Sequence, residues 1–310
     1  MAFNSLGKVG LVGVGAVGGF YGGLLARSGQ DVHFLFRSDY EFAVKNGLKV
    51  TTCLDESDSF RLNPLQAYRV AEEIGHCDWL IVAAKATANQ NLLEALQPLV
   101  GSSTSLLTLQ NGMGNVEFLR NAFGSDRRIV GGLCFTCSNR VAPCEVENYF
   151  PGYVQFGESE GPLSREGEQV MKAFQYAGIS CQAADSLEDA LWRKLCWNVP
   201  FNGLTVVAGG ITTDLILQDK ELTRRARCLM NEIQAAAAAY EVMIEDEFLE
   251  RQFKLTLPMG AYKPSSLLDF LAGREVEIES IFGEPLRRGT RVNVNMPELQ
   301  RLYGQLNGLK

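Results

Sequence analysis

Short apolar runs and helical periods alternate along the first half of the chain. Residues 9–14 predict a buried strand, residues 17–27 a helix that stops near Gly29, and residues 31–36 a second strand. Strand, helix and strand within about thirty residues are typical of the opening of a doubly wound parallel sheet.

The same alternation continues to about residue 183. Apolar runs at 79–84, 105–109, 129–136 and 179–183 predict further strands, and residues 89–99, 116–123 and 163–177 have helical spacing. Residues 48–52 and 59–62 predict a hairpin. Residues 141–156 combine Pro and Gly with alternating apolar positions, so we expect hairpin or edge structure there.

The pattern changes after Asp185, because helical periods continue while strand signals almost disappear. We therefore expect an α/β Rossmann-type domain over residues 1–184 and an all-α domain over residues 185–310. Residues 222–240 predict the longest helix. Its alanine run at 235–239 suits close packing, either inside the domain or in a homodimer.

Composition narrows the classes of partner. The chain has 36 acidic and 29 basic residues, a net charge of −7, which argues against nucleic acid. No window is long and apolar enough for a membrane span, so a soluble, cytoplasmic protein is expected. Eight cysteines and two histidines lack the spacing of a metal site, and free, mostly buried thiols are the simpler interpretation.

Residues 13–18 read Gly-Val-Gly-Ala-Val-Gly, between the first strand and its helix. In this context GxGxxG indicates a dinucleotide site. Gly13 would allow the tight turn, Gly15 the approach of the pyrophosphate, and Gly18 close packing of helix and strand. Amides at the helix start, including those of Ala16 and Val17, would bind the phosphates. A Gly-rich turn without a ligand is the alternative.

The end of the second strand indicates which dinucleotide is bound. NAD-binding proteins usually have an acidic residue there, whereas this chain has Arg37. A guanidinium can pair with the 2′-phosphate of NADP, so NADP(H) is the expected cofactor. Asp39 comes two positions later and could cap the following helix.

Two later strands also end in polar residues. Lys85 follows the strand at 79–84, and Asn111 follows the strand at 105–109. Each could be an ordinary surface or turn residue. Their matched positions at the carboxyl ends of strands favour a shared role in ligand binding.

Reduction of a carbonyl needs a proton donor for the developing alkoxide. His33 and His76 are poorly placed, so the donor should be a Lys, Tyr or Ser. Lys194, Asn198 and Asn202 recur every four residues on a predicted helix that is otherwise largely apolar. A polar ligand would offset the cost of burying this stripe; the alternative is a solvated surface stripe.

Two segments further along are polar at expected helix starts. Ser265 follows Pro264 and could cap the next helix. Glu277 and Glu279 begin another expected helical segment, where carboxylates suit the helix dipole.

Taken in order, these residues resemble the ketopantoate reductases over nearly the whole chain. The matching segments are residues 13–19, Arg37, Lys85-Ala86, residues 109–115, residues 192–195 with Asn198 and Asn202, Pro264-Ser265, Gly273-Arg274 and Glu277-Ile278. The chain departs from the family pattern at Ala88, Val276 and residues 266–268.

The resemblance implies a fold, a reaction and residue roles. The helical domain would be like the C-terminal domain of 6-phosphogluconate dehydrogenase. The reaction would be NADPH-dependent reduction of 2-dehydropantoate (ketopantoate) to (R)-pantoate, in pantothenate and coenzyme A biosynthesis. Lys194 matches the general acid and Glu277 the carboxylate that binds the substrate hydroxyl. Asn198, Asn202 and Ser265 match substrate-orienting groups, Asn111 a residue between nicotinamide and substrate, and Arg37 and Lys85 NADP contacts.

Two other hypotheses remain open. A different 2-oxo acid or an opine-like compound could be the substrate, because a pocket discriminates one methylene by only about 1–3 kcal/mol. The third hypothesis is a non-catalytic NADP-binding sensor, which loss of Lys194 or Glu277 would have favoured.

Overall fold

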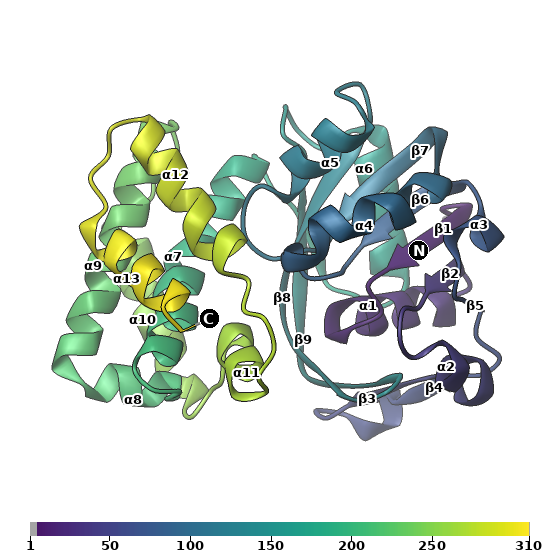
Figure 1. Cartoon of the computed structure of the whole chain (residues 1–310), viewed down its shortest axis with the longest axis horizontal. Coiled ribbons are helices and arrows are strands. Elements are labelled where there is room, and N and C mark those ends of the chain that lie inside the picture. Colours follow the sequence, from purple (N-terminus) through teal and green to yellow (C-terminus); the bar gives the residue numbers. More distant parts are fainter. Residues whose placement is uncertain (1–4, 310) are drawn as a thin grey trace. The chain divides into compact units, whose positions relative to one another are not determined.

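A computed structural model describes residues 5–309, which fall into two compact units (Figure 1). The first unit comprises the chain up to Asn111 together with Asn115–Leu187. The second comprises Gly112–Gly114 and the chain from Glu188 onward. Each unit has a hydrophobic core of its own.

The first unit is built on one ten-stranded sheet in the order β4-β3-β9-β8-β7-β6-β1-β2-β5, with β10 paired to β9. The strands are β1 (Lys8–Val12), β2 (Asp31–Leu35), β3 (Leu48–Thr52), β4 (Phe60–Leu62), β5 (Ala67–Tyr68), β6 (Cys77–Val82), β7 (Val100–Thr108), β8 (Ile129–Ala142), β9 (Glu145–Gly157) and β10 (Cys181–Ala183). The central strands are parallel, and β3/β4 and β8/β9 are antiparallel.

Helices cover the sheet because its central strands are apolar on both faces. Their bounds are α1 (Ala16–Arg27), α2 (Tyr40–Asn46), α3 (Ala71–Ile74), α4 (Asn89–Leu96), α5 (Asn115–Phe123) and α6 (Arg165–Tyr176), with 3₁₀ turns at Glu56–Asp58, Ala86–Ala88 and Gln97–Leu99. Helices α1 and α6 share a core with the sheet, in which Tyr21 and Phe174 are fully buried. The doubly wound, mostly parallel α/β domain expected from the sequence is thus confirmed.

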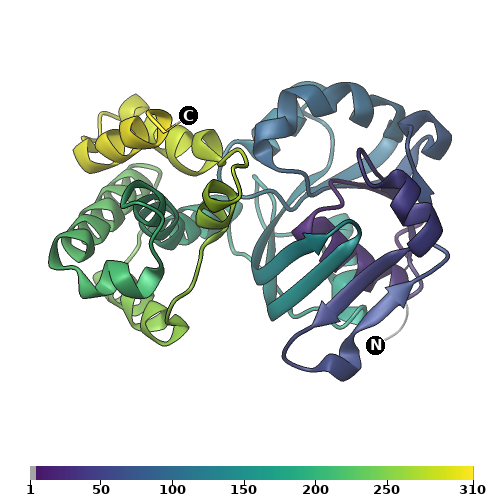
Figure 2. The same ribbon diagram turned by 60° about the horizontal axis from the view of Figure 1, so that its bottom comes forward.

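One strand of this sheet is longer than the sequence predicted. The strand expected at 129–136 runs on to Ala142 and turns directly into β9, giving the long antiparallel hairpin drawn in teal in Figure 2. The sheet is therefore mixed rather than wholly parallel. The hairpin turn includes Cys144, whose φ of 52° lies in the left-handed region that non-glycine residues rarely adopt.

The second unit is helical, as the change of pattern after Asp185 predicted. Its helices are α7 (Leu187–Val207), α8 (Thr213–Gln218), α9 (Lys220–Ala239), α10 (Asp246–Thr256), α11 (Ser265–Leu271), α12 (Glu284–Arg291) and α13 (Pro297–Asn307), with a 3₁₀ turn at Leu257–Met259 and a π-helix at Glu279–Gly283. Helix α7 has 21 residues and α9 has 20, so the expectation that α9 is the longest was wrong.

The alanine run of α9 packs partly inside this unit. Ala236 and Ala237 are fully buried. On α12, a Cβ added at Gly289 would lie 3.6 Å from the Ala236 Cβ and 2.2 Å from the Met296 sulfur. Small residues on both helices therefore permit this close approach. A homodimer through α9 stays a prediction.

Candidate active site

The turn between β1 and α1 requires glycine at two positions. Gly13 has φ +96°, and a Cβ there would lie 2.1 Å from the Ala84 amide nitrogen. A Cβ on Gly18 would lie 2.2 Å from the Gly13 carbonyl oxygen. Both positions are closed to larger residues, because the backbone itself occupies the space a side chain would need.

Gly15 is different, because a Cβ there would meet no atom within 4 Å. It is the N-cap residue of α1, and no side chain caps this helix. The first i→i−4 bond runs from the Gly19 amide to the Gly15 carbonyl, so the amides of Ala16, Val17 and Gly18 precede it. The first turn has no acidic residue. This helix start suits an anionic group.

At the end of β2 the charged side chains have separate surroundings. Arg37 is exposed. Asp39 accepts hydrogen bonds from the Ser38 hydroxyl at 2.8 Å and from Arg140 at 2.5 Å, and its side chain is only 12% exposed. The capping role considered for Asp39 is wrong, because its side chain makes no cap bond to α2. The carboxylate is engaged with Arg140, while the guanidinium of Arg37 is open to solvent.

Side-chain amides tie the turn after β6 to the turn after β7. The Gln110 Nε2 donates to the Ala84 carbonyl at 2.9 Å and to the Asn89 Oδ1 at 2.7 Å. Asn89 donates in turn to the Asn115 Oδ1 at 3.2 Å, and Asn115 donates to the Asn111 carbonyl at 3.0 Å. The two turns are therefore one hydrogen-bonded structure.

This network brings together the turns that carry Lys85 and Asn111, which sequence reasoning had paired only by their matched positions. Lys85 is exposed and Asn111 half-buried. No role in the site was expected for Gln110, Asn89 or Asn115. The sequence did contain one indication of their role. Side-chain amides, rather than apolar residues, follow the ends of two parallel strands, and buried amides need hydrogen-bond partners.

The three residues after Asn111 belong to the second unit. Met113 is buried in its core, and the Met113 amide donates to the Ser280 carbonyl at 2.8 Å. Gly112 has φ +82°, and a Cβ there would lie 2.4 Å from that same carbonyl. The turn therefore packs directly on the π-helix that follows Glu277, a contact that the sequence did not reveal.

Helix α7 carries Lys194, Asn198 and Asn202 on one face. Asn198 is 7% and Asn202 2% exposed, so two members of this stripe are buried and the solvated alternative is wrong for them. Trp192, fully buried, lies about 200° around the helix axis from Lys194. Lys194 itself is half-buried.

Asn202 contacts the start of α11. Its Oδ1 accepts a hydrogen bond from the Ser266 amide at 3.0 Å and one from the Ser265 hydroxyl at 3.3 Å. Pro264, rather than Ser265, is the N-cap of α11, so the capping role considered for Ser265 is wrong. Ser265 is instead brought to Asn202, 63 residues earlier in the chain.

Glu277 is 7% exposed and lies just before the π-helix at Glu279–Gly283. The sequence predicted an ordinary helix start here. A π-helix is rare and frequently marks a functional site. Ser280, on its first turn, is also 7% exposed, and its hydroxyl has no hydrogen-bond partner among the described residues.

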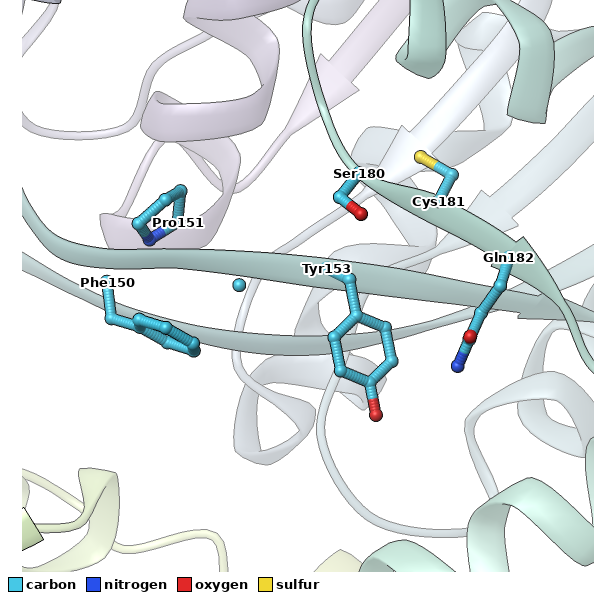
Figure 3. Close-up of a pocket in the computed structure, with 7 residues that line it drawn as sticks. Phe150, Pro151, Tyr153, Ser180, Cys181 and Gln182 are labelled. Atoms are coloured by element: carbon cyan, nitrogen blue, oxygen red, sulfur yellow. The ribbon is translucent and has the colours of Figure 1, made fainter. Parts of the chain in front are cut away.

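A pocket in the first unit is lined by none of the predicted site residues. Figure 3 shows it between β9 and β10, with the aromatic rings of Phe150 and Tyr153 projecting from the same strand. Ser180, Cys181 and Gln182 complete its opposite side. It has no charged lining residue, so it does not resemble a site for a dinucleotide or a 2-oxo acid.

Within residues 5–309, no helix is long and apolar enough to cross a bilayer, and no group of His, Cys, Asp or Glu could hold a metal ion. All eight cysteines are free. Cys53 is exposed, and only Cys77, Cys144 and Cys196 are buried, so the expectation of mostly buried thiols was too broad.

Comparison with known proteins decides the family. Residues 9–161 match the model of the ketopantoate reductase PanE/ApbA family, and residues 186–310 match the model of its C-terminal domain. The chain belongs to the ketopantoate reductase PanE/ApbA family. This confirms the resemblance recognised in the sequence.

Relatives matched over nearly their whole length support this membership. The chain is 36% identical to a 2-dehydropantoate 2-reductase of Nostoc sp., over 97% of this chain and 95% of that protein. A crystal structure of 2-dehydropantoate 2-reductase from Geobacter metallireducens is 40% identical, with a TM-score of 0.93 over 98% of this chain and all of that one.

The fold also occurs in D-mandelate dehydrogenase, solved as a ternary structure with NADH and anilino(oxo)acetate. That protein is 20% identical, with a TM-score of 0.88 over 97% of both chains. This likeness concerns the fold alone. For the present chain, membership of the ketopantoate reductase family makes it an oxidoreductase of that family.

Proposed function

We propose that this protein is an NADPH-dependent 2-dehydropantoate 2-reductase, forming (R)-pantoate for pantothenate and coenzyme A synthesis. The observation that carries the proposal is the stripe of Lys194, Asn198 and Asn202 on α7, whose two amides are buried in a unit of a ketopantoate reductase-family chain. Burying amides is costly unless they are hydrogen-bonded. The printed bonds of Asn202 go to Ser265 and Ser266 through its Oδ1, so its Nδ2 is suited to donate to an oxygen of the substrate.

The first unit fits a dinucleotide. The space at Gly15 leaves room for a pyrophosphate against the start of α1, where the amides of Ala16, Val17 and Gly18 would donate to it. Arg37 is exposed for a 2′-phosphate, while Asp39 is engaged with Arg140 and less able to bind ribose hydroxyls. Lys85 would add a second cation. These features support NADPH over NADH.

When bound, NADPH supplies the hydride that reaches the 2-oxo carbon. Lys194 then acts as the general acid, giving a proton from its ammonium group to the carbonyl oxygen, which becomes the 2-hydroxyl of the product. Before that transfer, its positive charge stabilises the negative charge developing on this oxygen. Because this charge appears only in the transition state, the interaction accelerates the chemical step.

The remaining residues would orient the substrate. Asn202 accepts both of its hydrogen bonds through Oδ1, so its Nδ2 donor is the group suited to a substrate oxygen. Asn198 and Ser265 would add polar contacts, and Asn111 would lie between nicotinamide and substrate. The Glu277 carboxylate would accept a hydrogen bond from the substrate hydroxyl, which distinguishes a hydroxylated 2-oxo acid from one without this group.

A different 2-oxo acid is the second candidate. Its support is the fold shared with D-mandelate dehydrogenase, whose structure holds anilino(oxo)acetate and NADH. The same Lys194 chemistry would serve either substrate, since both present a carbonyl next to a carboxylate.

The test is NADPH oxidation by the purified wild type with 2-dehydropantoate and with a panel of other 2-oxo acids, repeated with NADH. We expect the highest kcat/KM for 2-dehydropantoate with NADPH. A higher kcat/KM for an acid that lacks the hydroxyl would exclude the proposed substrate, and a preference for NADH would exclude the proposed cofactor.

A further inference from the structure

A chain of charged side chains in the second unit connects helix α7 with the π-helix that follows Glu277. Each member is joined to the next by a hydrogen bond or ion pair. In order, they are Glu188, Arg288, Glu284, Arg287, Glu279 and Tyr303. We call these six residues the α7–π network.

At the α7 end of the network, Arg288 is buried and Glu188 is half-buried. The Arg288 Nη1 donates to both Glu188 carboxylate oxygens, at 2.9 and 3.0 Å, and Arg288 is only 7% exposed. The fully buried Trp192 donates its indole N–H to the same carboxylate at 2.7 Å. Tyr240 packs against Trp192, and its hydroxyl donates to the Arg288 carbonyl at 3.2 Å.

The other end reaches the π-helix through two more carboxylates. Arg288 donates to Glu284 at 3.2 Å, and Arg287 donates to the other oxygen of Glu284 at 3.0 Å. Arg287 also donates to Glu279 at 2.8 Å. The Tyr303 hydroxyl donates to the remaining oxygen of Glu279 at 2.7 Å. Each carboxylate is thus bound from two sides.

The ends of the network are close in sequence to both candidate catalytic residues. Trp192 and Lys194 are two positions apart, or about 200° around the helix axis. The bond to the indole fixes the rotation of α7 about its own axis. It therefore also fixes the direction in which the Lys194 side chain projects from the helix. Glu279 is two residues after Glu277, so its bonds hold the segment from which the Glu277 carboxylate projects.

We propose that Arg288 is a positioning residue, which aligns Lys194 on α7 with Glu277 through the α7–π network. This inference rests on the proposed function of those two residues. Arg288 itself acts without touching the substrate. Apolar residues of similar volume often stabilise a core as well as buried ion pairs do. In this network each carboxylate accepts hydrogen bonds from two donor side chains, so the positions of α7, which carries Lys194, and of the segment that carries Glu277 are fixed. A proton transfer needs such a fixed geometry.

The test compares Arg288→Met with Arg224→Met. Arg224 is also in the second unit and also pairs with a glutamate, Glu221 at 2.6 Å, but both of these side chains are exposed. We expect Arg288→Met to lower kcat about 10–100-fold, to shift the pH profile of kcat, and to leave the Kd for NADPH unchanged. Arg224→Met should match the wild type, and Arg288→Lys should recover part of the loss.

A second variant, Glu279→Gln, tests the same proposal even if Arg288→Met, which replaces a buried side chain, does not fold. Glu279 is exposed, so its replacement should leave the protein folded while removing the charge and one of the two acceptor oxygens from the other end of the network. We expect the same direction of change in kcat and pH profile, and less than the product of the two losses when it is combined with Arg288→Met.

The outcomes separate the two proposals. Wild-type kcat and pH profile in folded Arg288→Met would overturn the positioning role, even if the variant melts at a lower temperature. Where Arg288→Met does not fold, an unchanged kcat and pH profile in Glu279→Gln would overturn it. A wild type that prefers another 2-oxo acid would overturn only the proposed substrate, and the variants would be assayed with that acid. A wild type that reduces no 2-oxo acid would overturn both.

Discussion

The two units present their candidate ligand groups in different ways. In the first unit the groups around α1 are backbone amides, and the space beside Gly15 is open because this residue has no side chain. In the second unit they are side chains on α7, α11 and the segment before the π-helix, held by hydrogen bonds between distant residues. A backbone site suits the phosphates common to all dinucleotides, whereas side chains can select one substrate and move one proton.

The largest expected effect comes from the second unit. In Lys194→Met, kcat should fall roughly 10²–10⁴-fold, because general acid catalysis contributes about that much. The Kd for NADPH should stay at the wild-type value, since the cofactor is assigned to the first unit. Steady-state assays and a fluorescence titration of NADPH measure the two quantities.

Lys220→Met is the matched control, because Lys220 is an exposed lysine of the same unit. It should have wild-type kcat. If Lys194→Met retained more than about a tenth of the wild-type kcat, the proton would have another donor.

Arg37→Ala should weaken cofactor binding, in contrast to Lys194→Met, which should lower kcat and leave cofactor binding unchanged. We expect its KM for NADPH to rise about 10–100-fold, the value of a lost charge-assisted hydrogen bond of roughly 1.5–3 kcal/mol. Its KM for NADH should hardly change, because NADH has no 2′-phosphate. Arg69→Ala, which removes another exposed arginine of the first unit, should leave both values unchanged. An equal rise of KM for NADPH and for NADH would argue that Arg37 does not bind the 2′-phosphate and contributes only to the positive charge around the cofactor.

Asn202→Asp sharpens the assignment of the substrate to α7. The aspartate can still accept the bonds from Ser265 and Ser266, but it loses the Nδ2 donor and adds a negative charge. We expect kcat/KM for the 2-oxo acid to fall roughly tenfold or more, since one lost hydrogen bond is worth about 1 kcal/mol before repulsion is counted.

Asn231→Asp is the control for this added charge, since Asn231 is exposed on α9. It should leave kcat/KM unchanged. Wild-type kcat/KM in a folded Asn202→Asp variant would show that the Asn202 amide does not face the substrate.

The smallest expected effect distinguishes two glycines of one turn. Gly15→Ala should keep the free energy of unfolding within about 0.5 kcal/mol of wild type and weaken NADPH binding several-fold, because its Cβ enters the space left for the pyrophosphate. Gly13→Ala should lower the free energy of unfolding by at least about 1–2 kcal/mol, the cost of a left-handed non-Gly residue. Chemical denaturation and NADPH titration compare them. An unchanged Kd for NADPH in Gly15→Ala would show that the pyrophosphate does not bind at this turn.

The same contrast explains how much could be predicted. The α1 turn is encoded within residues 13–18, so a local motif in its strand–helix context was sufficient. The contact of Asn202 with Ser266 joins residues 64 apart, and that of Glu188 with Arg288 joins residues 100 apart. Neither leaves a periodic signal. The sequence could therefore suggest that the polar face of α7 mattered, but not which residues hold it.

Local rules also failed where tertiary contacts override them. Asp39 and Ser265 both occupy positions suited to capping, yet one pairs with Arg140 and the other with Asn202. Glu277 precedes a π-helix rather than an α-helix, and the next residues pack on the turn at Gly112 and Met113. The apolar run ending near residue 136 continues as a strand because β9 pairs with it along its length.

The most direct test of the proposed reaction follows the hydride itself. Purified wild type would be incubated with 2-dehydropantoate and NADPH deuterated at C4, each face in a separate reaction, and the product examined by mass spectrometry and NMR. The proposal predicts pantoate with deuterium at C2 from one of the two cofactors. Pantoate without deuterium from both, or no pantoate at all, would contradict it.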